Sequence, residues 1–174
     1  KVKRIWIMKT HKIVAIFFYL TIISCNIYSF SGASISEEIK SFSLNNIYSQ
    51  VSNSPSSLSQ ITKDNLQDLI LSQTNLALLD ESIADLNFSA SITKYEIKPI
   101  AINANETTAK NRLTINLKVD YTNAKNKNLN YNTTFSRYRD FDSSINFAEI
   151  ELDLINEITK ELAEDTFNKA FVNW

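Results

Sequence analysis

The residue of this sequence with the clearest chemistry is Cys25, because a thiol can be acylated, oxidised or bound to a metal. It is the one cysteine among the 174 residues. A short basic stretch and then an apolar run, from Ile13 to Ile23, precede it. That run is about half as long as the ~20 residues of a membrane-spanning helix, and it is typical of the central part of an export signal. Cys25 therefore stands at the expected cleavage position of an exported chain.

The four residues Ile22-Ile23-Ser24-Cys25 resemble a bacterial lipobox, in which the cysteine is lipidated and becomes the first residue of the mature chain. The alternative is an uncleaved apolar anchor that happens to contain a cysteine. The sequence begins without methionine, and Met8 is the expected translation start. We expect a signal peptide over 1–24, a lipidated tether over 25–36 and a single α+β domain over 37–174.

A second group of residues that could do chemistry is basic. Guanidinium groups pair bidentately with phosphate as well as with carboxylate. The basic residues around the expected sheet hairpin are Lys110, Arg112, Lys118, Arg137 and Arg139. They are candidates for contact with an anionic ligand or a partner. The alternative is pairing with Glu106, Asp140 or Asp142 on a solvated face, since Arg112 would lie across from Asp140 if Leu113 opposes Arg139.

Charge and composition exclude several classes of function. Cleavage before Cys25 removes five of the 18 Lys and Arg residues and none of the 19 acids, which leaves a net charge of −6 on the mature chain. This balance argues against nucleic-acid binding. The one histidine, His11, lies in the signal peptide, and Gly32 is the one glycine. A Ser-His-Asp triad, a His/Cys metal site and a Gly-rich phosphate loop are therefore excluded. We expect a protein that is not an enzyme, with no metal and no cofactor.

The elements that position the basic residues are mainly strands. Alternation predicts a first strand near Ile39–Ile47, and Leu76–Leu79 is a brief strand candidate. From Leu86 to Ile97 the alternation changes parity, which predicts a β-bulge near Thr93 and Lys94. The sequence then predicts a strand over 112–121, a polar turn over 123–128, and a returning strand that includes Leu129, Tyr131, Thr133 and Phe135.

Two helices complete the pattern. The first is predicted over Ser57–Gln73, and the second begins near Ser143 or Ser144, either of which is a plausible N-cap. The second helix has an apolar stripe and an acidic, solvent-facing surface. At its end, Phe167, Phe171 and Trp174 share one helical face, which favours core packing, with docking on a partner as the alternative. The fold class is α+β: a two-layer sandwich with two helices on one face of a roughly four-stranded, mostly antiparallel sheet.

Several segments are similar to the LptE family of lipopolysaccharide (LPS) assembly lipoproteins, in its Bacteroidetes-type form. They are the stretch from Cys25 to Ile35, Asn105-Glu106-Thr107 with Asn111 to Ile115, Phe135-Ser136-Arg137-Tyr138, and Asp165 to Trp174. The resemblance runs over essentially the whole mature chain. It implies two helices on a four-stranded sheet, which agrees with the interpretation above.

The resemblance also implies a function. Family members are anchored on the periplasmic side of the cell outer membrane, plug the β-barrel of LptD in a one-to-one complex, and deliver LPS to the outer leaflet. Cys25 is the one residue whose role transfers directly. We expect the uncharged side chains Thr114, Asn116, Asn132 and Thr134, with Lys118, to face the barrel. The alternative function is a structural or lipid-carrier lipoprotein of another envelope complex.

Overall fold

The computed structural model describes residues 35–100 and 109–172, which belong to a compact unit that spans Ser31–Trp174. Cys25, the signal peptide, Glu106 and Trp174 lie outside the described residues. In chain order the elements are β1 (Ser41–Leu44), β2 (Tyr48–Ser49), α2 (Ser56–Gln73), β3 (Ala77–Leu78), β4 (Leu86–Ile100), β5 (Lys110–Asn123), the 3₁₀ turn η1 (Lys127–Leu129), β6 (Tyr131–Asp142) and α3 (Phe147–Phe171).

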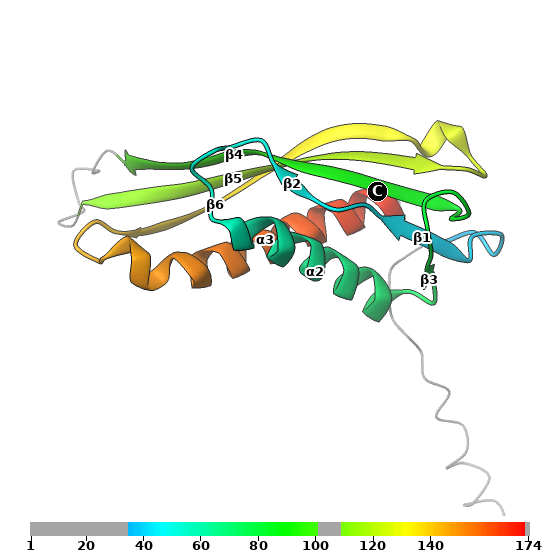
Figure 1. Cartoon of the computed structure of the whole chain (residues 1–174), viewed down its shortest axis with the longest axis horizontal. Helices are drawn as coiled ribbons and strands as arrows, with labels where there is room; N and C mark the ends of the chain where they lie inside the picture. Colours follow the sequence, from blue (N-terminus) through cyan, green and yellow to red (C-terminus); the bar gives the residue numbers. More distant parts are fainter. Residues whose placement is uncertain (1–34, 101–108, 173–174) are drawn as a thin grey trace, which may run out of the picture. The chain divides into compact units, whose positions relative to one another are not determined.

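The strands form one mixed sheet in the order β3-β1-β4-β5-β6, with β2 also paired to β4. The long strands β4, β5 and β6 pair antiparallel. Strand β1 pairs in parallel with β3 and with β4, and β2 pairs in parallel with β4. Both helices lie on the same side of the long strands (Figure 1). The predicted α+β class is confirmed, with six strands in place of four. Strands β2 and β3 are two residues long, too short to show a period of two.

A β-bulge lies where the change of parity predicts it. The register between β4 and β5 shifts between Ile92 and Lys94, so Thr93 is the extra residue. Before the shift, Phe88 and Ile92 point toward the helices, and after it Tyr95 takes that side. The bulge therefore keeps apolar residues on the helix side along the whole strand.

The ends of two elements differ from the sequence prediction. Helix α3 begins at Phe147, and its N-cap is Asn146, whose side chain accepts a hydrogen bond from the Ala148 amide. The predicted caps do not cap it, because Ser144 donates to the Asp142 carboxylate and lies in the preceding turn. Leu129 belongs to η1 and not to the returning strand, which begins at Tyr131.

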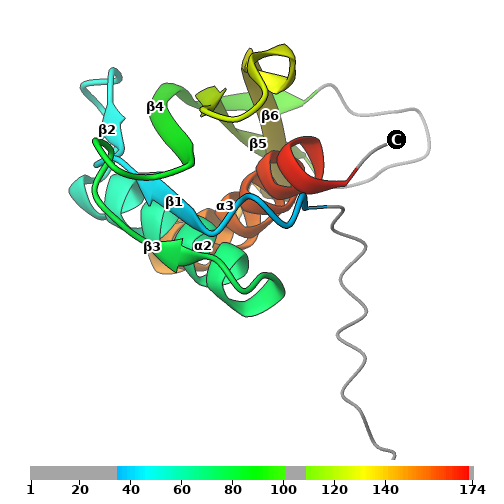
Figure 2. The same cartoon turned by 90° about the vertical axis from the view of Figure 1, so that its right-hand side faces the viewer.

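The core lies between the sheet and the two helices, which run beside each other beneath it (Figure 2). Its largest fully buried side chains include Phe42, Phe88 and Tyr121. Each such side chain contributes about 1.5–3 kcal/mol by its burial. Phe167 and Phe171 are also buried, so these two aromatics pack in the core as expected. Within the described residues, no helix combines the length and hydropathy needed to cross a membrane.

Candidate functional site: the open face of the sheet

Within residues 35–100 and 109–172, no helix covers one face of the long strands, which we call the open face. Its side chains alternate with the buried ones: Lys94, Glu96 and Lys98 on β4; Lys110, Arg112, Thr114, Asn116, Lys118 and Asp120 on β5; Asn132, Thr134, Ser136, Tyr138 and Asp140 on β6. All of them are half-buried or exposed. The residues predicted to share one polar face do share it: Thr114, Asn116, Lys118, Asn132 and Thr134.

One end of the open face is charged. Lys98, Arg112 and Asp140 are direct neighbours across the three strands. Arg112 donates from Nε and Nη2 to the two Asp140 carboxylate oxygens, at 2.6 and 2.9 Å. The predicted cross-strand pair is therefore confirmed. The guanidinium lowers the pKa of the Asp140 carboxyl, and it also lies 3.7 Å from the centre of the Tyr138 ring.

Two lysines complete this basic end, and the sequence interpretation missed both. Lys94 and Lys98 each lie 2.9 Å from a different oxygen of Glu96, and these pairs lower the pKa of that carboxyl. Lys98 is also directly opposite Arg112, an arrangement of like charges that costs stability in an isolated sheet. The predicted bulge carried the missing signal, since counting past Thr93 places Lys94 and Lys98 on the open face.

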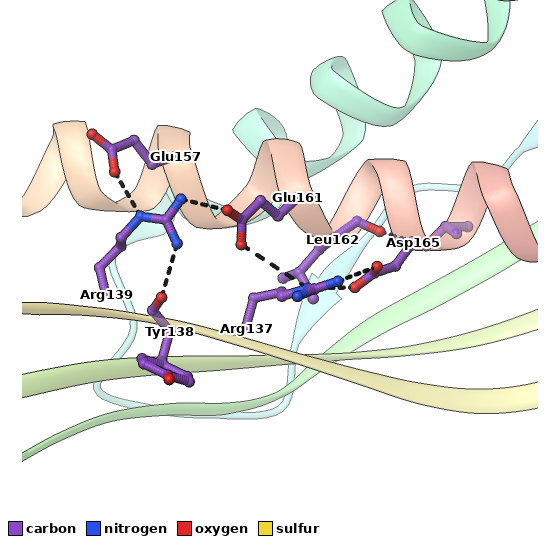
Figure 3. Close-up of polar contacts among 8 residues, drawn as sticks. Arg137, Tyr138, Arg139, Glu157, Glu161, Leu162 and Asp165 are labelled. Carbon is purple, nitrogen blue, oxygen red and sulfur yellow. Dashed lines mark hydrogen bonds and ion pairs between the residues drawn. The ribbon is translucent and has the colours of Figure 1, made fainter.

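Arg137 and Arg139 do not join this group, because they point to the helix side of β6. Arg137 donates to both carboxylate oxygens of Asp165, and Arg139 donates to Glu157 at 2.7 Å and to Glu161 at 2.5 Å (Figure 3). The five candidate basic residues therefore separate onto two faces. Extending the alternation of Tyr131, Thr133 and Phe135 by two steps predicts this side for both arginines.

The acidic surface of α3 is not simply the solvent-facing surface that the sequence predicts. Part of it is tied to the rest of the domain, because Glu157, Glu161 and Asp165 hold the two arginines of β6. Another acid, Glu151, accepts a hydrogen bond from the Tyr95 hydroxyl. Burial, together with this bond, raises the pKa of that tyrosine. These carboxylates bind strands to α3 and are not a freely solvated face.

Beyond its charged end, the open face is uncharged apart from Lys118 and Asp120. Thr114 lies opposite Tyr138, Asn116 opposite Ser136, and Lys118 opposite Thr134. The Asn116 Oδ1 atom is buried and has no hydrogen-bond partner among the described residues. Short neutral side chains lose little solvation when another surface covers them. This part of the face is therefore suited to contact with a protein or lipid surface.

The described residues contain no group of three or more His, Cys, Asp or Glu side chains that could hold a metal ion. An uncovered polar sheet face with a basic end, on a domain of this size, has the character of a binding or assembly module.

Comparison with known proteins supplies the family. The chain matches the family model LptE, described as lipopolysaccharide-assembly, over residues 44–170. No curated protein sequence matches it. Its structure is similar to a minor lipoprotein from Acinetobacter baumannii, at 12% identity and a TM-score of 0.50, covering 76% of this chain and 92% of that chain. A rare lipoprotein B from Shewanella oneidensis aligns at 12% identity and a TM-score of 0.43, covering 72% of this chain and 91% of that chain.

The match spans most of the chain. The protein is therefore of the class of lipopolysaccharide-assembly lipoproteins. The chain belongs to the LptE family.

Proposed function

We propose that this protein is an outer-membrane subunit of the LPS translocon, held on the periplasmic side by lipid on Cys25. It plugs an LptD-like β-barrel in a one-to-one complex, helps the barrel to assemble, and assists delivery of LPS to the outer leaflet. The observation that carries the proposal is the open face, in a chain whose family is one of LPS assembly.

The uncharged part of the open face supports contact with the barrel wall. When a plug enters a barrel, the barrel wall covers part of the plug's polar surface. Burying unpaired ions in this way would be costly. Thr114, Asn116, Thr134 and Ser136 carry no charge, and they lie in neighbouring rows of two strands. They can approach a second wall at a small desolvation cost.

The basic end of the same face supports contact with LPS phosphates. Lys98, Lys110 and Arg112 lie on adjacent positions of β4 and β5, and Lys118 lies further along β5. Lys98 and Arg112 are paired with Glu96 and Asp140, and an anion bound over both cations would share them with these carboxylates. Arg137 and Arg139 are assigned no ligand role, because they lie on the helix side of the sheet, where α3 holds both guanidinium groups. No catalytic step is part of this proposal.

The test is purification of the full chain from native outer membranes, followed by mass spectrometry. We expect one large β-barrel protein at one-to-one stoichiometry, and LPS in the same complex. A complex with other envelope proteins would support the alternative, a structural or lipid-carrier lipoprotein.

A charge-reversal pair tests the role of the open face. The double variant Lys98→Glu and Lys118→Glu should lower LPS binding to the purified chain by about tenfold or more, since two favourable phosphate contacts become repulsive. Lys160→Glu reverses a lysine charge on the exposed surface of α3, away from the open face, and is the control. Equal binding by all three chains, with unchanged melting temperatures, would exclude LPS contact at the open face.

A further inference from the structure

Within the part of the chain that the structure describes, Tyr138 is the one aromatic side chain that the long strands present on the open face. Figure 3 shows it pointing away from α3, on the side opposite to Arg137 and Arg139. The Arg112 guanidinium lies over the ring, 3.7 Å from its centre, and covers one face of it. Since 49% of Tyr138 is exposed, the other face of the ring is accessible. The ring is an apolar surface, held in place by a cation, on an otherwise polar face.

The charged groups beside the ring are paired with each other and still have hydrogen-bonding capacity. Arg112 donates to Asp140 from Nε and Nη2, so its Nη1 group keeps its N–H donors among residues 35–100 and 109–172. Each Asp140 carboxylate oxygen accepts one of these bonds and has a second acceptor site. The pair carries no net charge. Its remaining donors and acceptors suit a hydroxyl group, which both donates and accepts.

The ring and this ion pair belong to a group of six side chains, which we call the platform, in two neighbouring rows across β4, β5 and β6. The platform consists of Glu96, Thr114 and Tyr138 in one row and Lys98, Arg112 and Asp140 in the next. By the spacings of a sheet it measures about 10 Å across the strands and about 7 Å along them. Its two cations and two carboxylates cancel in charge. The platform therefore suits a small ligand that is polar and has an apolar face.

A sugar ring has this character. A pyranose ring carries C–H groups on its flat faces and hydroxyl groups around its rim. The C–H groups are weakly positive and the face of an aromatic ring is negative, so the two attract each other when they stack. Hydroxyl groups of a sugar stacked on Tyr138 would lie within reach of Arg112 and Asp140. An acyl chain would leave these polar groups without partners, and a bare phosphate would not use the ring.

We propose that the platform binds a sugar ring, stacked on Tyr138 and hydrogen-bonded to Arg112 and Asp140. The inference rests on the proposed function, since it assigns the saccharide part of LPS to this place on the open face. Tyr138 supplies the stacking, which no other side chain of the platform can supply. The other occupant to test is a protein partner that uses Tyr138 as an interface anchor.

The test uses the full chain in detergent micelles and LPS from which all acyl chains have been removed, so that sugars and phosphates remain. Calorimetric titration measures the dissociation constant, and saturation-transfer NMR should show sugar C–H protons lying against the protein. Tyr138→Ser should weaken binding by about fivefold or more, because stacking is lost, whereas Tyr138→Phe should stay within about twofold. Tyr48→Ser is the matched control, since Tyr48 is also exposed but lies beside Ser91, away from the platform.

Inorganic phosphate separates the sugar from its substituents. It should bind the unmodified chain and Tyr138→Ser equally, because it does not use the ring. An equal loss of phosphate binding in Tyr138→Ser would show that the ring only positions Arg112, and it would overturn the stacking proposal.

The remaining outcomes distinguish the platform from the proposed function. Normal binding of deacylated LPS by a folded Tyr138→Ser variant would overturn the platform, as would the absence of binding to the unmodified chain at millimolar concentration. Recovery of the barrel complex from native membranes would still support the proposed function in both cases. If Tyr138→Ser loses the barrel protein but binds deacylated LPS normally, the occupant is a protein partner and the proposal is wrong.

Discussion

At the scale of single residues, Asp85 is the polar side chain with the most connections at the start of β4. Its carboxylate accepts hydrogen bonds from the Lys40 amide at 2.9 Å and the Ser41 hydroxyl at 3.0 Å, and it forms an ion pair with Lys125. These contacts tie β1 and the β5–η1 turn to β4. The bond from the Lys40 amide, with the contacts to Lys125 and Ser41, lowers the pKa of Asp85 to about 2.

We predict that Asp85→Asn lowers the free energy of unfolding at neutral pH by about 1–2 kcal/mol, because hydrogen bonds to a charged acceptor are replaced by weaker ones. The pKa of Asp85 is lower in the folded than in the unfolded chain. Its contribution is therefore present above about pH 4 and is lost as the pH falls toward about 2. Urea unfolding at neutral pH and near pH 2 measures the difference in stability between the unmodified chain and Asp85→Asn. Asp68→Asn, on the exposed surface of α2, is the control. A difference that does not shrink in acid would contradict the assignment.

We predict that lipid on Cys25 anchors the protein to the membrane. Cys25→Ser should leave an unprocessed precursor or a soluble chain, since two or three acyl chains hold a protein stably on a membrane and this variant cannot receive them. Labelling with radioactive palmitate and membrane fractionation measure the outcome. Normal processing and outer-membrane recovery of this variant would show that lipid on Cys25 is not the anchor.

At the scale of elements, the bulge at Thr93 decides which side chains of β4 face the core. It lets Ile92 and Tyr95 point to the helix side although they lie three residues apart. If Thr93 were paired in a regular ladder instead, Lys94 and Glu96 would replace Tyr95 and Ile97 on the helix side. A slip of one residue moves every later side chain of a strand to the opposite face.

Deletion of Thr93 should therefore cost less than about 1.5 kcal/mol, because it removes the unpaired residue and leaves Lys94 opposite Asn116 and Tyr95 opposite Ile115, with Tyr95 still on the helix side. Thr93→Ala keeps the bulge and is the matched control, with an expected cost below about 1 kcal/mol. Thermal and urea unfolding of both variants measure the difference. A loss of about 3 kcal/mol or more on deletion would mean that the later half of β4 does not keep its register without this residue.

At the scale of the whole molecule, the fold depends on apolar packing and hydrogen bonding. One contiguous core joins the sheet to both helices, from Ile39 in the first segment to Phe171 at the end of α3. The ion pairs between β6 and α3 lie at its border and are partly exposed. Exposed ion pairs of this kind contribute modestly, so the buried side chains supply most of the stability.

We predict that EDTA leaves the melting temperature of the full chain unchanged. The His and Cys ligands of typical structural metal sites are absent after Cys25, and the described residues hold no cluster of metal ligands. A structural metal would contribute folding energy that a chelator removes. Differential scanning calorimetry with and without EDTA measures the effect, and a fall of several degrees would reveal a metal site.

Much of this architecture was predictable from local patterns. The alternation from Leu113 to Tyr121 reports a strand with one buried side, the change of parity after Ile92 reports the bulge, and the spacing of Leu58, Leu66 and Ile70 reports a helix. Each of these patterns is complete within one segment, because side chains alternate along a strand and recur every 3.6 residues along a helix. The α+β class and the polar open face follow from them.

The tertiary structure alone decided how the segments meet. Strands β2 and β3 are defined by their neighbours, since two residues cannot show a period. The pairing of Arg137 and Arg139 with α3 depends on how a helix far along the chain crosses β6. The contact between Arg112 and Tyr138 depends on how β5 and β6 pair. These features arise from contacts between residues distant in sequence, and such contacts leave no periodic signal in either segment.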